Sequence, residues 1–172
     1  MTNRVLDKDK GYKQLMKAMA QLSKDPYILV GITREKGSKK PDGSKATVAE
    51  YGTYNEFGTG IVHGRSGAIT IRVPERSFLR STVDERRERY FKLLLKAIDD
   101  EIMGKHTIRF GFSKVGERAA ADVRRKIRTL REPPNAPATI ERKGSSNPLV
   151  DKGPLIESIH YEFKPSSKGV AS

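Results

Sequence analysis

Two long amphipathic segments follow one another in the middle of the chain, and they constrain the fold more than any other feature. In the first, apolar residues recur every fourth position, and Gly104 ends the segment; its apolar residues are Tyr90, Leu94, Ile98 and Ile102, flanked by Phe91 and Leu95. The second carries a comparable stripe, formed by Val115, Ala119, Val123, Ile127 and Leu130. This spacing predicts helices over about 82–103 and about 114–130. Each helix has one apolar face, which it must bury against another element.

Shorter segments predict a small sheet and an N-terminal helix. Alternation predicts strands in "YILVGIT", "AITIRV" and "IHYEF", which begin at Tyr27, Ala68 and Ile159. Both faces of the first strand are apolar, so we expect it to be buried on both sides. The segment "HTIRFGFS" after Gly104 fits a strand as well as a helix.

The N-terminal helix is expected over about 9–24. Its apolar face is formed by Tyr12, Leu15, Met16, Met19 and Leu22. One helical turn is expected near 137–142 and another over Leu155–Ser158, with Pro154 in its first turn. The expected fold class is α+β, a small mixed or antiparallel sheet packed with two long helices and an N-terminal helix, with extended loops.

The glycine-containing stretch "EYGTYNEFGTG" resembles a phosphate loop at first sight. Thr47 and Glu50 have the spacing of a capping box, and Gly58 stands where a glycine would end the helix. A phosphate loop lies between a strand and a following helix and ends in Gly-Lys-Ser/Thr. Here the glycines follow a helix and that ending is missing, so the sequence favours a short glycine-ended helix.

The charge of the chain favours an acidic partner or a polyanion. Its 172 residues include 34 Lys and Arg against 21 Asp and Glu, a formal charge of +13. The loop over 34–46 is expected to be an exposed basic arm carrying Lys36, Lys39, Lys40 and Lys45. A second basic set lies on the later helix, at Arg124, Arg125 and Arg128. For both sets a plain solvated surface is the alternative.

Residues for catalysis or metal binding are sparse. There are no cysteines, and His63, His106 and His160 are too scattered for a paired zinc site. No Gly-x-Ser-x-Gly elbow occurs. We therefore expect no catalytic residue, cofactor or metal, and a protein that is not an enzyme. The first residues lack a signal-peptide core and no apolar run has membrane-spanning length, so we expect no secretion and no membrane partner.

Three stretches together resemble the neck or tail-completion proteins of long-tailed bacteriophages. They are "NEFGTG" from Asn55, "VPERSFLRSTVDE" from Val73, and "ATIERKGSSNPLVDKGPLIESIHYEF" from Ala138. The family has a segment like "NEFGT", a "PxRxFLR" turn, a long helix, a further helix, and "PLVDTGxLxxSI" before a strand. The order matches from about 55 to 163. Lys152 and Pro154 depart from the family pattern, which usually has Thr and a polar residue there.

The resemblance implies a structural virion protein at the head–tail junction, assembled in the host cytoplasm. It would join the portal and connector side of a DNA-filled capsid to the top of the tail, as a ring in which a hexamer is favoured over a dodecamer. Implied partners are a connector or head-completion protein, tail terminator or tail tube proteins, and genomic DNA in the channel. The implied scaffold and interface residues are Asn55, Glu56, Phe57, Gly58, Pro74, Arg76, Phe78, Leu79, Arg80, Leu149, Asp151, Gly153, Leu155, Ser158 and Ile159.

Further expectations concern roles and alternatives. Arg76 and Arg80 are expected to pair with acids or to be solvated, while Phe78 and Leu79 anchor the turn in the core.

The chain is expected to form one domain over 1–164 with a flexible tail over 165–172. A basic nucleic-acid-binding module is the alternative function, although no recognition motif such as that of an RRM is present. A nuclease is a third class, which would require metal-dependent DNA cleavage.

Overall fold

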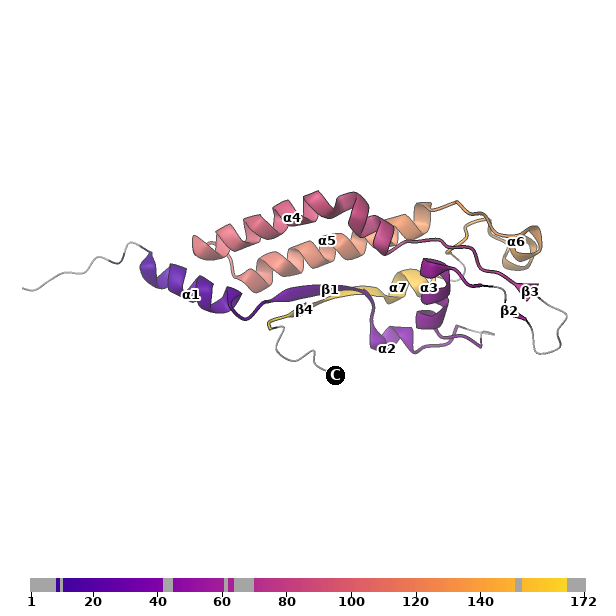
Figure 1. Ribbon diagram of the computed structural model, residues 1–172, viewed down its shortest axis with the longest axis horizontal. Helices are drawn as coiled ribbons and strands as arrows, with labels where there is room; N and C mark the ends of the chain where they lie inside the picture. The colour runs from indigo at the N-terminus through magenta and orange to yellow at the C-terminus, as the bar shows by residue number, and fades with distance from the viewer. Residues whose placement is uncertain are drawn as a thin grey trace, which may run out of the picture. The chain divides into compact units, whose positions relative to one another are not determined.

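The computed structural model describes residues 9, 11–41, 45–60, 62–63, 70–150 and 153–166. Within these residues two long helices accompany shorter helices and small sheets (Figure 1). The elements in chain order are α1 (Tyr12–Leu22), β1 (Tyr27–Ile32), α2 (Arg34–Gly37), α3 (Val48–Phe57), β2 (Val62–His63), β3 (Thr70–Ile71), α4 (Arg80–Ile102), α5 (Ile108–Thr129), α6 (Pro137–Lys143), α7 (Pro154–Ser158) and β4 (Ile159–Lys164). The predicted α+β class with a small sheet is confirmed.

The described strands form two small sheets of two strands each. Strand β1 pairs with β4, and β2 pairs antiparallel with β3, with Val62 opposite Ile71. Of the predicted strand from Ala68, Thr70 and Ile71 form β3, while Ala68 and Ile69 lie outside the described residues; β2 was not predicted. Strand β1 is not buried on both faces, since Leu29 is exposed. Apolar residues on both faces of a strand therefore overstated its burial.

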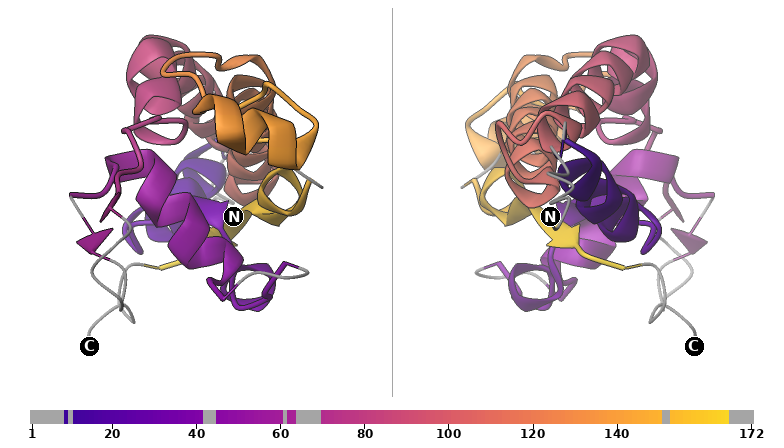
Figure 2. Two further views of the ribbon diagram at one scale, coloured as in Figure 1. Left: turned by 90° about the vertical axis from the view of Figure 1, so that its right-hand side faces the viewer. Right: turned by 90° about the vertical axis from the view of Figure 1, so that its left-hand side faces the viewer.

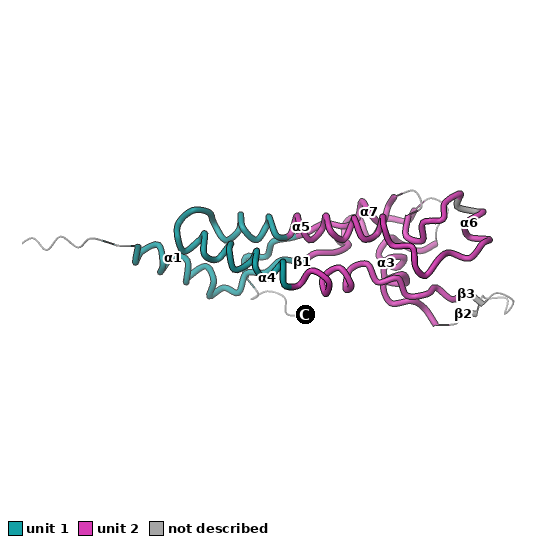
Figure 3. Tube along the Cα trace, turned by 90° about the horizontal axis from the view of Figure 1, so that it is seen from above, with its two compact units in different colours: residues 1–29, 88–115, 162–172 teal, residues 30–87, 116–161 magenta. Residues whose placement is uncertain are grey.

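The chain divides into two compact units, coloured separately in Figure 3. Unit 1 consists of 1–29, 88–115 and 162–172, and unit 2 of 30–87 and 116–161. The long helices α4 and α5 and the strands β1 and β4 each contribute to both units. The single domain expected over 1–164 stays a prediction.

The core of unit 1 lies where α4 and α5 approach each other. It is built from Ala97, Ile108 and Phe112, against which pack Leu22, Ile28, Leu94, Ile98 and Phe163. A Cβ added to Gly111 would lie 2.4 Å from the Cβ of Ala97, so glycine is required for this close approach. The burial of Ile108 and Phe112 at helical spacing decides the ambiguous segment "HTIRFGFS" in favour of a helix.

Two burial predictions in unit 1 are wrong in detail. Leu94 and Ile98 were expected to be buried but are half-buried, and Ala97 is the buried residue of that turn of α4. On α1 the residue that is fully buried is Ala18, while Tyr12, Leu15, Met16 and Met19 of the predicted core face are exposed. Of the predicted apolar face, Leu22 packs on the core of unit 1, and the other four residues stay exposed.

The core of unit 2 is larger and draws on distant parts of the sequence. It consists of Val48, Phe78, Ala120, Val123, Ile127, Leu149, Leu155 and Ile159. The predicted burial of Val123 and Ile127 is confirmed, at 1% and 0% exposed. Figure 2 shows α3 and α7 in neighbouring positions, in agreement with their contacts.

An ion cluster accompanies the packing of α4 against α5 in unit 2. The carboxylate of Asp122, with a side chain 1% exposed, lies 3.7 Å from Nε of Arg86 and 3.6 Å from Nε of Arg118. Nearby, Lys126 of α5 pairs with Glu85 of α4. These charges hold the two helices in register around the apolar core.

Candidate functional site

The carboxylate of Glu56, in the last turn of α3, caps the N-terminus of α4. Its oxygens accept hydrogen bonds from the main-chain N–H of Phe78 and of Leu79, both at 2.8 Å, and from that of Arg80 at 2.9 Å. The hydroxyl of Ser77 donates a fourth, at 2.8 Å. The first N–H groups of a helix have no partner within the helix and carry partial positive charge. A buried carboxylate satisfies both requirements, and Glu56 is 3% exposed.

The local sequence explains why α3 presents Glu56 in this position. The predicted capping box is confirmed at its start, where the N–H of Glu50 donates to Thr47 Oγ1 at 3.2 Å and the N–H of Thr47 donates to the Glu50 carboxylate at 2.7 Å. At its end Gly58 has φ +70° and ψ 175°, so it is not left-handed helical but still requires positive φ. A Cβ there would lie 3.0 Å from the main-chain nitrogen of Glu75. Glycine therefore lets the chain before α4 pass close to the end of α3.

Arg76 joins the same helix end to the loop that follows α5. Its main-chain N–H donates to the Asn55 carbonyl at 2.6 Å, and its Nη1 donates to Asn55 Oδ1 at 3.4 Å. Nε donates to the Pro133 carbonyl at 2.7 Å. Nη2 donates to the Pro134 carbonyl at 2.8 Å and to Asn135 Oδ1 at 3.3 Å. One buried guanidinium thus connects two loops and a helix.

Arg76 was predicted either to pair with an acid or to be solvated, and the structure shows neither. The side chain is neither solvated nor paired with an acid, because Arg76 is 5% exposed and its acceptors in the described part of the chain are carbonyl oxygens. Burial lowers the pKa of the Arg76 guanidinium below its ordinary value, but arginine keeps its proton. The five N–H groups of a guanidinium suit several fixed carbonyl acceptors better than an ammonium would.

Ser77 and Asn135, which complete this arrangement, were missed from the sequence. Asn135 follows the "EPP" stretch, whose prolines cannot donate a main-chain hydrogen bond. The carbonyls of such a loop need donors from elsewhere, and a buried arginine supplies them. The adjacent prolines Pro133 and Pro134 are the sequence signal that could have indicated a contact between their carbonyls and Arg76.

The stretch from Ala138, the third that resembles the neck family, contributes buried residues to the core of unit 2. Leu149, Leu155 and Ile159 are buried in the same cluster as Phe78, and Leu79 packs against that cluster. Ser158 is buried and its hydroxyl donates to the Leu155 carbonyl at 2.7 Å. Gly153, with φ +92°, precedes α7, and Pro154 takes the first turn as predicted. Asp151 lies outside the described residues, and Pro74 is half-buried.

Next to the buried cap lies an exposed group of three side chains. Phe57, which follows Glu56, is 62% exposed. The guanidinium of Arg80 lies 5.6 Å from the centre of the Phe57 ring and forms an ion pair with Glu75. The prediction that Arg80 meets an acid is therefore confirmed. Cation–π contact and ion pairing at an exposed site contribute modestly to stability.

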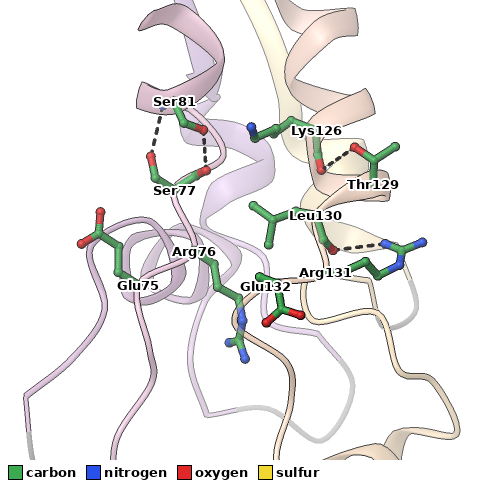
Figure 4. A pocket seen from close by; sticks show the side chains of 9 residues that line it. All are labelled: Glu75, Arg76, Ser77, Ser81, Lys126, Thr129, Leu130, Arg131 and Glu132. Atoms are coloured by element: carbon green, nitrogen blue, oxygen red, sulfur yellow. Dashed lines mark hydrogen bonds between the residues drawn. The ribbon is translucent and has the colours of Figure 1, made fainter. Parts of the chain in front are cut away.

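An open pocket of about 620 Å³ lies beside this group in unit 2 (Figure 4). Arg76 and Ser77 line it from the turn before α4, and Ser81 from the first turn of α4. Lys126 lines it from the last turn of α5, and Leu130 from the residue after that helix. Its cationic side chains are already engaged. Lys126 pairs with Glu85, and the Arg131 guanidinium donates to the main-chain carbonyls of Arg128 and Leu130.

The Lys-rich segment is partly ordered, in contrast to the expected loop. Residues Arg34–Gly37 form the helical turn α2, and Gly37 is buried. The ammonium of Lys36 donates to the Glu157 carbonyl at 3.2 Å, so Lys36 contacts the fold. Lys39, Lys40 and Lys45 are exposed. The expected arm is therefore shorter than 34–46, and residues 42–44 lie outside the described part.

The arginines of α5 divide into two kinds. The guanidinium of Arg124 donates to the Ile159 carbonyl at the start of β4, within unit 2. Arg125 and Arg128 are exposed. Arg124 therefore acts within the fold, and Arg125 and Arg128 are the members of this set that a partner can reach.

Neither a metal site nor a membrane-spanning helix emerges from the described residues. They contain no group of three or more His, Cys, Asp or Glu side chains placed to hold a metal ion. None of their helices has the length and apolar character needed to cross a bilayer. Comparison of the chain with protein-family models, curated proteins and solved structures gave no match.

Proposed function

We propose that this protein is a structural component of the neck of a long-tailed bacteriophage. In this role it joins the connector side of a DNA-filled capsid to the top of the tail as one copy of an oligomeric ring, and it has no enzymatic activity. One observation carries the proposal: the three stretches that resemble the neck family meet in unit 2. Asn55 and Glu56 hold the turn and helix start at 76–80, and Phe78 shares a core with Leu149 and Ile159.

This arrangement supports a mechanical rather than a chemical role. The polar side chains that resemble family motifs are engaged in hydrogen bonds that fix helix ends and loops. Glu56 accepts four hydrogen bonds, and Arg76 donates to oxygens of two segments, the end of α3 and the 133–135 loop. A rigid junction of this kind suits a subunit that must keep its shape while DNA passes. The exposed side chains beside it, Phe57 and Arg80, are available to neighbouring proteins.

Deletion in a phage that encodes this chain tests the proposal. We expect filled heads and finished tails that do not join, as seen by electron microscopy of lysates. Supplying the wild-type chain from a plasmid should restore joined particles. Infectious particles from the deletion would refute the neck function, and empty heads or missing tails would indicate an earlier step in assembly.

A nucleic-acid-binding module is a second candidate, favoured by the charge of +13 and by the exposed Lys39, Lys40, Arg125 and Arg128. Phosphate contacts make affinity fall steeply with salt, because each contact releases counterions. Titration of labelled duplex DNA with the purified chain at several salt concentrations separates the two candidates. Tight binding with a steep salt dependence supports the DNA-binding module. Weak binding, together with the deletion result above, supports the neck protein.

A further inference from the structure

Two arginines share one buried carboxylate where α4 and α5 meet in unit 2. The Asp122 carboxylate lies 3.7 Å from Nε of Arg86 on α4 and 3.6 Å from Nε of Arg118 on α5. These are ion-pair distances, longer than ordinary hydrogen bonds. Two guanidinium groups against a single carboxylate leave one positive charge without a counterion within this group. Arg86 and Arg118 are called the arginine pair below.

The arginine pair reaches solvent, although the carboxylate that holds it does not. The side chain of Arg86 is 30% exposed and that of Arg118 41%, whereas that of Asp122 is 1% exposed. Within the described part of the chain, the two guanidinium groups form no hydrogen bond, and their ion pairs are those with Asp122. A guanidinium has five N–H groups, so both arginines keep donors for a ligand that arrives from solution.

The exposed acids next to the arginine pair in sequence do not neutralise it. Glu85 is bound to Lys126. On an α-helix, adjacent residues lie about 100° apart around the axis, and residues two apart lie about 160° apart by the shorter way. The other acids next to the pair stand in these positions, turned away from Arg86 or Arg118, and they are Asp84, Glu88 and Glu117.

We propose that the arginine pair binds a backbone phosphate of a nucleic acid. The planar fork of a guanidinium matches the oxygens of a phosphate, and two forks can hold one phosphodiester group from two sides. Both side chains are drawn to the carboxylate of Asp122, so they lie near each other before a ligand binds. Less conformational freedom is then lost on binding than for two independent surface arginines.

The charge of the chain favours a polymer over a single anion as the ligand. One anion held by exposed side chains gains little free energy, as do other exposed ion pairs. A nucleic acid offers a row of phosphates, and the formal charge of +13 attracts them together. A single close phosphate contact gives weak binding, which is compatible with either candidate function. The site does not rest on the neck function, although DNA in the channel of a neck would be such a ligand.

Chemical modification of the wild-type chain tests the site directly. Phenylglyoxal reacts with accessible guanidinium groups, and mass spectrometry of the resulting peptides gives the rate at each arginine. We expect duplex DNA to slow the modification of Arg86 and Arg118 more than that of Arg125, which is exposed on α5. Equal slowing at the three arginines, or none, would show diffuse attraction and overturn the site.

The same measurement identifies the anion. Inorganic phosphate and a polyglutamate peptide each replace the DNA at equal ionic strength. Protection of the arginine pair by inorganic phosphate as strong as that by DNA would assign the site to free phosphate. Equally strong protection by polyglutamate would assign it to an acidic protein. Either result would overturn the nucleic acid as the ligand.

Removal of the whole charged group provides a second test. Arg86→Gln, Arg118→Gln and Asp122→Asn together lower the net charge by one and leave no buried carboxylate unpaired. Arg125→Gln is the matched control, because it also lowers the net charge by one, at an exposed position of α5.

Both variants are titrated with labelled duplex DNA at several NaCl concentrations, after circular dichroism has confirmed that they are folded. The combined variant should reduce the slope of log K against log[NaCl] by about 1, since one phosphate contact is lost, while the control keeps the wild-type slope. The same slope in both variants would overturn the proposal. If the combined variant does not fold, the modification rates of the wild-type chain still decide.

The outcomes separate this site from the neck function. If the deletion phage fails to join heads to tails but DNA does not protect the arginine pair, the site is wrong and the neck function stands. If DNA protects the pair as expected but the deletion yields infectious particles, the site stands and the neck function is wrong.

Discussion

Asn55 and Arg76 are joined by two hydrogen bonds, one from the main-chain N–H of Arg76 to the Asn55 carbonyl at 2.6 Å and one from its guanidinium to Asn55 Oδ1 at 3.4 Å. Both residues are buried, and they come from different stretches of the sequence. The pair fixes the end of α3 to the turn that starts α4. Its neighbour Glu56 completes the junction by capping α4. The polar residues of "NEFG" therefore form their hydrogen bonds with the turn "PERSF", and this contact accounts for their burial.

Replacing Arg76 by Lys should destabilise the protein. Lysine cannot reach the acceptors on α3 and on the 133–135 loop at once, so carbonyls of that loop lose their donors. We expect a loss of about 2–3 kcal/mol in the free energy of unfolding, measured by urea denaturation. Arg80→Lys is the matched control in the same motif, because its ion pair with Glu75 is exposed. It should change stability by less than about 1 kcal/mol. Equal effects of the two variants would contradict the role given to Arg76.

Replacing Glu56 by Gln tests the cap on α4. The amide keeps the shape of the side chain but loses the charge, and its NH₂ group meets N–H donors instead of accepting from them. We expect a loss of about 2–4 kcal/mol in the free energy of unfolding. Glu35→Gln, at an exposed position of α2, serves as control and should stay within about 0.5 kcal/mol. A Glu56→Gln protein as stable as the control would show that the carboxylate does not support the helix start.

The two cores should respond differently to truncation. Ile127 is fully buried in unit 2, whereas Leu94 is half-buried in unit 1. Ile127→Ala should cost about 2–5 kcal/mol in the free energy of unfolding. Leu94→Ala should cost less, because part of its surface already contacts water. Thermal or urea unfolding of both variants measures the two losses of stability. A larger loss for Leu94→Ala than for Ile127→Ala would contradict the deeper burial of Ile127.

Periodicity predicted the helices well, because a helix needs an apolar row and ends at recognisable residues. The stripe from Val115 to Ile127 and the capping box at Thr47 and Glu50 appear as predicted. Burial was less predictable, since it depends on which neighbour covers each side. On α1 small Ala18 packs and large Tyr12 does not. The site could be predicted as a set of motif residues, but not as a hydrogen-bond network. Nothing in the spacing of Glu56 and Phe78 along the chain indicates that they meet.

The capping box at the start of α3 should make stability depend on pH. The N–H of Thr47, followed by its hydroxyl, lowers the pKa of the Glu50 carboxyl below its ordinary value of 4.5. A carboxyl whose pKa is lower in the folded state stabilises fully above its unfolded pKa, and the contribution disappears as the pH falls through the folded value. The stability difference between wild type and Glu50→Gln should therefore be present at pH 6 and shrink below pH 4.5. A difference that is constant over this range would contradict the prediction.

The two exposed basic sets should have separate roles in head–tail joining. Lys39, Lys40 and Lys45 are exposed near the ordered turn α2, and lysines hold phosphates loosely as point charges. Changing these three to Gln should leave joining intact or alter retention of DNA in the particle. Arg125 and Arg128 are exposed on a rigid helix, where a guanidinium can pair bidentately with a neighbour's carboxylate. Changing them to Gln should reduce the yield of joined particles.

Arg124 does not belong in that experiment as an interface residue, because it donates to the Ile159 carbonyl within unit 2. Arg124→Gln serves instead as the control for lost stability, with a lower Tm and a yield of joined particles that recovers at lower temperature. Arg125→Gln with Arg128→Gln should lower the yield at unchanged Tm. Particle counts by electron microscopy and unfolding of the purified variants measure the two effects. Lysine changes that block joining while the Arg125 and Arg128 changes have no effect would reverse these roles.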